Sequence, residues 1–511
     1  MKATIIRGRT IVRGIDPDGH VSQTDDAAVL VRDGTIVEVG PARDLPAHDG
    51  AEVIGGEDFV VLPGFVDAHH HVGLTPLQLG APDLPLELWA NYRMGARRVD
   101  LYLDTLYSAF ELVRSGVTTV QHLHGRVSGG VDEVADGARE VIRAYRDLGM
   151  RVSYAYALRD QNRVVYADDE TFYARLPDDI AGPLRATVDA QALSADENLE
   201  VFRVLSGEFA DAGDVAIQLA PLNFQWCSDR ALERVAALSH ERGTLVHLHL
   251  LETPYQRAYA RKRTGGSALG HLDRVGLLNE RMTLGHGVWT TADDLDLVAE
   301  RSTSICHNCS SNLRLQSGWA PVNAMLDRGI RVALGIDEAG MNDDRDMLQE
   351  MRQVLRTHRV PGHQARVPSV AEVFRMATEN GAGTTGFGAR IGRIDPGRAA
   401  DLVLMRWSRI ARPFLDPDVS VLDAVVQRGK SDAVDTVLIG GVPVLRGGRF
   451  TRIDEEAALG DLADFMNRPA DEDERRRRVM VRRLMPHIEA FYEDWLAEEP
   501  FEPYDVRNSR N

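Results

Sequence analysis

An apolar run that starts at Phe59 leads into three consecutive histidines, in the sequence Pro63-Gly64-Phe65-Val66-Asp67-Ala68-His69-His70-His71. Side chains on an extended strand alternate between its faces, so we expect His69 and His71 to point the same way and His70 to point away from them. Two imidazoles about 6–7 Å apart on one face suit a single divalent ion. Paired histidines on a strand can also have a purely structural role in packing. Further candidate ligands elsewhere in the chain are therefore needed to support a metal site.

Three later apolar runs also end in titratable side chains. His249 and Glu252 end the first, His286 ends the second and Asp337 ends the third. Polar groups placed repeatedly where buried strands stop are typical of the catalytic face of a TIM barrel. Eight strand-like runs alternate with helix-like segments, which predicts a parallel barrel over residues 59–389. The runs are 59–66, 117–124, 151–158, 215–222, 245–250, 282–288, 303–307 and 331–337.

Short strand patterns with turn signals flank this region on both sides. Residues 1–58 and 390–453 share that rhythm, so we expect them to fold together as a small β domain beside the barrel. Beyond about residue 454 the chain is charged and helical, which predicts a C-terminal helical extension over 454–511. Its apolar residues recur at helical spacing and should pack on the body or on another subunit; they are Met480, Leu484, Ile488 and Phe491.

Composition and charge exclude several classes of function. The formal net charge of -18 argues against a nucleic-acid or acidic-membrane partner, because phosphate surfaces would repel the molecule. No apolar run approaches the roughly 20 residues of a membrane span, and residues 1–4 lead straight into a strand pattern and not into a signal segment. We therefore expect a cytoplasmic enzyme with a small-molecule substrate.

Lysine and cysteine usage narrows the kind of metal site. The lysines are Lys2, Lys262 and Lys430, and none ends a central strand, so no carboxylated lysine can bridge two metals. A mononuclear site is the prediction. Cys306 and Cys309 have C-x-x-C spacing but no second pair completes a zinc site, and we expect them to pack at a strand end.

The residues at the strand ends predict a metal-activated hydrolase. Zinc, with iron(II) or manganese as alternatives, can be held by imidazoles and one carboxylate with a position left open for water. The candidate ligands of one ion per chain are His69, His71, His249 and Asp337. Such an ion lowers the pKa of bound water from 15.7 towards about 7, and Asp337 can take the proton released.

Two further groups complete the predicted chemistry. Glu252 follows His249 by three residues, where it could protonate a ring nitrogen or a leaving group. His286 could polarise the reacting centre. Each alone could be a surface carboxylate or a core histidine, and their position beside the metal ligands favours a catalytic site.

The short motifs along the chain carry a family resemblance. They are residues 63–71, Gly116-Val117-Thr118-Thr119, His249-Leu250-Leu251-Glu252, Gly285-His286, Ser311-Asn312-Leu313-Arg314-Leu315 with Ser317-Gly318, Gly335-Ile336-Asp337 and Gly397-Arg398-Ala399-Ala400-Asp401-Leu402. Over residues 3 to about 450 the chain resembles the amidohydrolase superfamily, in its cytosine-deaminase-like branch with the chlorohydrolases and triazine hydrolases (the ATZ/TRZ type).

The resemblance implies an α/β fold with a distorted TIM (β/α)8 barrel and a composite β-sandwich domain built from both flanks. It also implies one divalent metal ion and, commonly, homo-oligomers. The metal ligands and the roles of Glu252 and His286 are the same as those inferred from the residues themselves.

Departures from the family pattern mark candidate substrate residues. His122 and His124 end the second barrel strand where relatives often carry acidic or apolar residues, although this pair could also be packing. Glu338 stands where relatives often have glycine, and Asn312 lies in a shared motif. The connections 73–88 and 159–180 should cover the pocket, and residues 89–114 should form a helix; Trp89, Tyr92, Phe224 and Trp226 would suit a flat substrate.

The leading prediction is hydrolytic deamination of an aminated nitrogen heterocycle. The same machinery could instead cleave an amide, urea or carbamate bond or displace chloride, and the sequence leaves these reactions open. A third possibility is a non-catalytic scaffold on this fold, which should have lost ligands and should bind no metal.

Overall fold

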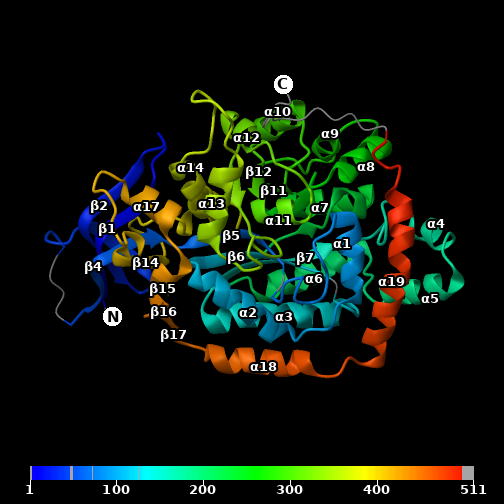
Figure 1. The fold of residues 1–511 in the computed structure, drawn as a ribbon, viewed down its shortest axis with the longest axis horizontal. Coiled ribbons are helices and arrows are strands. Elements are labelled where there is room, and N and C mark those ends of the chain that lie inside the picture. The colour runs from blue at the N-terminus through cyan, green and yellow to red at the C-terminus, as the bar shows by residue number, and fades with distance from the viewer. Residues whose placement is uncertain (1–2, 46–49, 72, 126, 498–511) are drawn as a thin grey trace.

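A ring of parallel strands forms the centre of the molecule in the computed structural model, which describes residues 3–45, 50–71, 73–125 and 127–497 (Figure 1). Two sheets make up the ring, one of β5 (Phe65–His70), β6 (Val117–His124), β7 (Arg151–Leu158), β8 (Val215–Ile217) and β9 (Ala220–Pro221), the other of β10 (Val246–Leu250), β11 (Met282–His286), β12 (Ser304–His307) and β13 (Val332–Leu334). Isolated bridges join Leu219 to Val246 and His70 to Asp337. The predicted TIM-like barrel is confirmed.

The run predicted as the first barrel strand, residues 59–66, is in fact two strands of different sheets. β4 (Glu52–Pro63) pairs with strands of the β domain, and β5 begins at Phe65. Gly64 lies between them, and a Cβ there would come within 2.2 Å of Thr118 Oγ1. The Gly64 N–H donates to the Asp401 carbonyl at 2.9 Å. Because β4 continues past residue 58, the β domain reaches Pro63.

The β domain takes strands from both ends of the chain, as predicted. They form one sheet in the order β17-β16-β15-β14-β4-β1-β2-β3, and Ile6, Val29, Leu404 and Leu438 meet in its core. An ion pair of 2.7 Å between Arg151 and Asp401 joins it to the barrel. The remaining strands are β1 (Ala3–Ile15), β2 (Val21–Arg32), β3 (Thr35–Pro41), β14 (Leu402–Arg406), β15 (Val434–Ile439), β16 (Val442–Arg446) and β17 (Arg449–Phe450).

The prediction of a single helix over residues 89–114 is wrong in the middle of that range. The chain forms α1 (Leu86–Tyr92) and the 3-10 turn η1 (Arg93–Gly95), then becomes extended at Ala96 and starts α2 (Leu101–Arg114). Asp100 caps α2 by accepting the Leu103 N–H at 3.0 Å. An N-cap side chain satisfies a backbone donor that a continuous helix would have used internally. The break leaves α1 free to cover the catalytic face.

The other helices before the C-terminal extension surround the barrel, line its connections or, between β14 and β15, accompany the β domain. They are α3 (Val131–Leu148), α4 (Asp169–Tyr173), α5 (Asp178–Asp189), α6 (Ala195–Glu208), η2 (Phe224–Trp226), α7 (Asp229–Arg242), α8 (Pro254–Thr264), α9 (Ala268–Arg274), α10 (Ala292–Glu300), α11 (Cys309–Arg314), α12 (Val322–Asp327), α13 (Met347–Thr357), α14 (Val370–Arg375), η3 (Met376–Asn380), α15 (Gly381–Gly383), η4 (Gly388–Arg390), α16 (Trp407–Ile410), α17 (Val421–Arg428) and η5 (Ser431–Ala433). Within the described ranges no helix is both long and apolar enough to span a bilayer.

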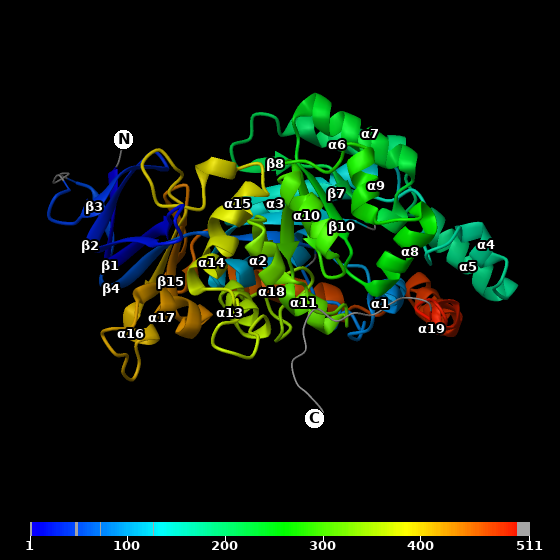
Figure 2. The same ribbon diagram turned by 90° about the horizontal axis from the view of Figure 1, so that it is seen from above.

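The C-terminal extension folds back along the barrel. α18 (Glu455–Asn467) packs against α2, and α19 (Glu472–Tyr492) packs against α1, η1 and α5. Figure 2 shows α19 at the end of the molecule opposite the β domain. Met480, Leu484 and Ile488 are buried there, so packing on the body is confirmed for the part that is described. The rest of the predicted extension, residues 498–511, lies outside the described residues.

Candidate metal centre and active site

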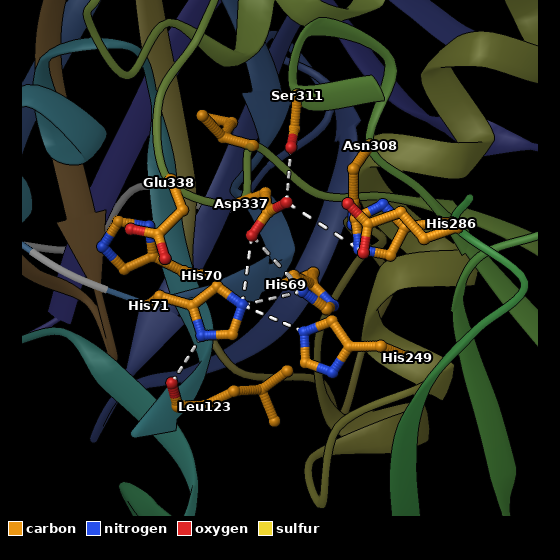
Figure 3. Close-up of polar contacts among 12 residues, drawn as sticks. His69, His70, His71, Leu123, His249, His286, Asn308, Ser311, Asp337 and Glu338 are labelled. Carbon is orange, nitrogen blue, oxygen red and sulfur yellow. Dashed lines mark hydrogen bonds and ion pairs between the residues drawn. The ribbon is translucent and has the colours of Figure 1, made fainter. Parts of the chain in front are cut away.

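The four predicted metal ligands converge at the carboxyl ends of β5, β10 and β13 (Figure 3). His71 Nε2 lies 3.1 Å from His69 Nε2, 3.1 Å from His249 Nε2 and 3.1 Å from Asp337 Oδ1. His69 Nε2 lies 3.6 Å from the same carboxylate oxygen. Three imidazole nitrogens and one carboxylate oxygen thus face a common centre.

The outer ring nitrogens make this donor set fit a divalent ion. His71 Nδ1 donates to the Leu123 carbonyl at 2.7 Å, and His249 Nδ1 donates to the Leu222 carbonyl at 2.6 Å. A proton held on Nδ1 leaves Nε2 with its lone pair directed at the centre, which is the arrangement usual for metal-ligating histidines. These residues can hold zinc or a similar ion.

Burial and charge set the protonation of this cluster. Burial lowers the pKa of His69 to about 4 and holds the pKa of His249 well below its usual value. Burial also opposes the charged form of His71, but the Asp337 and Glu338 carboxylates outweigh it and raise the pKa of that ring. At neutral pH His69 and His249 are therefore neutral, as metal binding requires.

The backbone places Asp337 in an unusual conformation. Its φ of 65° lies in the left-handed region, as does the φ of 75° at His286. The Asp337 N–H donates to the His69 carbonyl at 2.7 Å, and Asp337 Oδ2 accepts the Ser311 hydroxyl at 2.6 Å. Non-glycine residues held in this region cluster at functional sites, and these two hydrogen bonds fix the direction of the carboxylate.

Glu252 and His286 lie together on one side of the cluster. His286 Nε2 is 3.6 Å from Glu252 Oε2 and 3.8 Å from Asp337 Oδ2. Glu252 is only 2% exposed, and burial raises its pKa well above the usual range. A shift in this direction favours the protonated carboxyl, which can act as an acid. Asp337 and Glu252 thus offer a base and an acid beside the same cluster.

A cavity extends from this cluster, and its lining can be compared with the predicted substrate residues. His124 and Glu338 line it. Glu338 pairs with Arg93, whose guanidinium lies 4.7 Å above the Trp89 ring. His122 is absent from the lining; its ring nitrogens contact Tyr145 Oη at 3.0 Å and His124 Nδ1 at 3.2 Å. His122 therefore supports His124 from behind, which is the packing alternative.

Asn312 also lies outside the cavity lining. Its Oδ1 lies 2.8 Å from His286 Nδ1 and accepts that ring proton. Asn312 thus orients His286. Of the four predicted aromatic residues, Trp89 and Trp226 line the cavity, whereas Tyr92 and Phe224 do not.

Several residues that line the cavity were not singled out in the sequence, although three of them lie in the connections 73–88 and 159–180, which were predicted to cover the pocket. Glu87 comes from α1, Arg159 and Tyr166 from the connection after β7, and Tyr492 from α19. The Arg159 guanidinium lies 4.5 Å above the Trp226 ring. None of these residues has metal-ligand spacing. The connections that hold Glu87, Arg159 and Tyr166 were expected at the pocket, whereas only the folded chain brings Tyr492 there.

The predicted packing of the cysteines agrees with their surroundings. Cys306 and Cys309 are buried, and Cys309 Sγ lies 3.2 Å from Thr357 Oγ1. His307 and His358 lie close to Cys309, and their Nε2 atoms are 2.9 Å apart. His307 Nδ1 has no hydrogen-bond partner among the described residues, whereas a metal-ligating histidine almost always donates from that nitrogen. We interpret this cluster as packing.

The family model for the amidohydrolase family matches residues 60–444. The chain belongs to the amidohydrolase family. A shorter match, residues 27–48, is to an imidazolonepropionase-like composite domain of bacteria. The predicted family is thus confirmed, and this member is a metal-dependent hydrolase that acts on carbon–nitrogen bonds.

Named relatives are deaminases. A 5-methylthioadenosine/S-adenosylhomocysteine deaminase of Syntrophomonas wolfei is 30% identical over 453 residues, which are 87% of this chain and 95% of the relative. A 5'-deoxyadenosine deaminase of Methanothermobacter thermautotrophicus is 30% identical over 84% of this chain and 92% of its own length.

Solved structures share the fold. An adenosine deaminase from Xanthomonas campestris with bound zinc has a TM-score of 0.77 and 28% identity, covering 91% of this chain and 98% of its own. An atrazine chlorohydrolase from Arthrobacter aurescens has a TM-score of 0.76 and 21% identity, covering 91% of this chain and 100% of its own. The second likeness concerns the fold alone.

Proposed function

We propose that the chain is a hydrolytic deaminase of an aminated nitrogen heterocycle, with adenine-type purines as the first candidates. One divalent ion per chain, zinc first and iron(II) or manganese as alternatives, is held by His69, His71, His249 and Asp337. The observation that carries the proposal is the buried Glu252 carboxyl beside His286 and Asp337. Burial raises the pKa of Glu252 and so favours its protonated form, which joins an acid to a base at one centre.

Each residue has a distinct part in the reaction. When bound, the ion supplies Lewis-acid activation that makes water nucleophilic at neutral pH. Asp337 accepts one proton from the water and passes it to the amino group, which leaves as ammonia when the carbon–nitrogen bond breaks. The second proton of the water replaces the one that Glu252 donates. Glu252 donates its proton to a ring nitrogen of the substrate, which makes the carbon that bears the amino group more electrophilic. His286, oriented by Asn312, stabilises the oxygen that adds to that carbon.

The cavity walls support a flat substrate. Trp89 and Trp226 are aromatic residues of the cavity lining, while His124 and Glu338 provide polar groups. Aromatic walls with few polar groups are usual in pockets for small heterocycles. The names of the relatives add support for a purine, since each of the two named above acts on an adenine-containing compound.

Ammonia release tests the proposal. Zinc-loaded protein is incubated with aminopurines and their nucleosides, aminopyrimidines, pterins and aminotriazines, beside the Asp337→Asn variant, which keeps the side-chain size but loses the base. We expect the wild type to release ammonia from at least one purine. The rate of release by the variant should be lower by about a hundredfold or more.

Silence across the whole panel, from protein that binds its ion, would contradict the deaminase. Amides, ureas, carbamates and chlorinated heterocycles are then assayed on the same protein. Protein that binds no ion would support the scaffold instead. Assembly into homo-oligomers and a cytoplasmic location stay predictions of the sequence.

A further inference from the structure

Helix α19 of the C-terminal extension packs on the elements that cover the cavity. It contacts α1 and η1, which carry Trp89 and Arg93, and it contacts α5. Its apolar residues share one hydrophobic cluster with residues of the cavity wall, namely Val164, Tyr166, Val188 and Trp226. Figure 1 shows α19 beside α1 and next to α4 and α5.

One residue of α19 reaches the cavity itself. Tyr492 lines it and is 6% exposed. Its hydroxyl oxygen accepts the Tyr166 N–H at 3.0 Å, and its ring meets the Tyr166 ring edge to face with centroids 5.5 Å apart. The ring also contacts Tyr255, at 5.4 Å. Several aromatic contacts thus hold Tyr492 in one position.

Tyr492 is linked through two side chains to the loop that carries the predicted acid. The Tyr166 hydroxyl donates to Glu87 Oε1 at 2.7 Å, and the Thr253 hydroxyl donates to the same oxygen at 2.6 Å. Thr253 directly follows Glu252 in the chain. A change at Tyr492 can therefore be felt at the loop of Glu252 as well as in the cavity.

The lining of the cavity combines two groups of residues. His71, His249 and Asp337 belong to the metal centre, and Val188 and Tyr492 form a second group; the space beside this second group is called the outer part. The second group comes from α5 and α19, outside the barrel strands. A free heterocyclic base would occupy the part at the metal centre and leave the outer part without substrate atoms.

We propose that the outer part of the cavity binds a substituent on the reacting heterocycle, and that Tyr492 is a specificity-determining residue for that substituent. The inference rests on the deaminase proposed above. Its substrate class is an aminated ring that carries an extended group, such as a nucleoside, in preference to the free base. The C-terminal extension thereby completes the substrate site.

The test compares substrates that share one ring and differ in the attached group. Adenine, adenosine, 5-methylthioadenosine and S-adenosylhomocysteine are assayed with zinc-loaded wild type and Tyr492→Ala. We expect the wild type to prefer the substituted purines. Tyr492→Ala should lower kcat/KM for them by about tenfold or more through loss of aromatic contact, while kcat/KM for adenine, which lacks the substituent, should fall much less. The ratio between the two kinds of substrate therefore falls.

Two variants distinguish a change in substrate specificity from a general loss of structure or activity. Tyr492→Phe keeps the ring and loses only the hydroxyl, so it should retain most of the preference. Glu489→Ala alters an exposed position of the same helix and should leave all values as in the wild type. An unchanged ratio in Tyr492→Ala, or equal losses on adenine and on the substituted purines, overturns the proposal.

A second measurement needs no substrate. The rate at which 1,10-phenanthroline removes zinc from the loaded protein reports access through the cavity, because metal-centre residues and Tyr492 line the same space. We expect several-fold faster removal from Tyr492→Ala and wild-type rates from Glu489→Ala. If no purine is deaminated, this measurement still tests the role of Tyr492. Equal rates of zinc removal in all proteins would overturn that role. Faster removal from Tyr492→Ala would support it and would contradict only the proposal of a purine substrate.

Discussion

At the scale of the residue, the metal ligands are the part of the site that the sequence predicts best. His69 and His71 follow an apolar run at the spacing that places two rings together, and their Nε2 atoms lie 3.1 Å apart. His249 and Asp337 end other strands, where a barrel gathers its functional groups. Spacing and strand-end position are local properties, so they can be read before the fold is known.

The substrate residues could not be predicted equally well. His122 and His124 have the same spacing as His69 and His71, but His122 contacts Tyr145 and only His124 lines the cavity. Alternation on a strand states which residues share a face and does not state what packs against that face. Tyr492 carried no local signal, since it is brought to the cavity by a helix far along the chain.

Glu252 gives a prediction with a defined pH dependence. Burial raises the pKa of Glu252 well above its usual range and so favours the protonated carboxyl, and an acid works only in that form. Activity should therefore fall as the pH rises through the pKa of Glu252, giving an alkaline limb. In Glu252→Gln, kcat should fall by about a hundredfold or more and that limb should vanish, as measured by ammonia release across pH.

Metal content is the control for Glu252→Gln. The glutamine has the same size and Glu252 is not among the predicted ligands, so zinc per chain should equal that of the wild type. A variant that keeps wild-type kcat and its alkaline limb would contradict the role of Glu252 as the acid.

Among the secondary-structure elements, the positions of the strands could be predicted from the sequence, but the strands that each one pairs with could not. All the predicted barrel runs appear as strands, but the run over residues 59–66 divides at Gly64 between two sheets. Apolar patterning reports burial and cannot tell which sheet buries the strand. Likewise the helical pattern over 89–114 continues through Ala96–Asp100, where tertiary contacts and the Asp100 cap interrupt the helix.

The junction at Gly64 gives a prediction about stability. A Cβ at this position would lie 2.2 Å from Thr118 Oγ1 and 2.4 Å from Thr118 Cγ2, both in a buried β-branched side chain. Gly64→Ala should therefore lower the free energy of unfolding by about 1–3 kcal/mol, as measured by urea denaturation.

A matched variant controls for the glycine itself. Gly207 lies in α6, and a Cβ there would meet nothing within 4 Å. Gly207→Ala should be neutral or should stabilise by roughly 0.5–1 kcal/mol, because it favours the helix. Equal unfolding free energies for Gly64→Ala and the wild type would show that the junction tolerates a side chain.

At the scale of the whole molecule, a β domain at one end and α19 at the other enclose the barrel (Figures 1 and 2). The two flanks could be paired from sequence because they repeat the same short-strand rhythm. The amphipathic spacing in the extension predicted that it would pack, and its apolar residues do pack on the elements that cover the cavity. Its place there depends on contacts between segments hundreds of residues apart.

His69, His71, His249 and Asp337 should together hold one divalent ion, and the metal content of the purified protein is the measurement that tests this. Purified protein is loaded with zinc, freed of excess ion and measured by mass spectrometry, beside His249→Ala. We predict one zinc per wild-type chain and, because a ligand is lost, far less than one in the variant. Wild-type protein that retains no zinc, or a variant that retains as much as the wild type, would contradict the account.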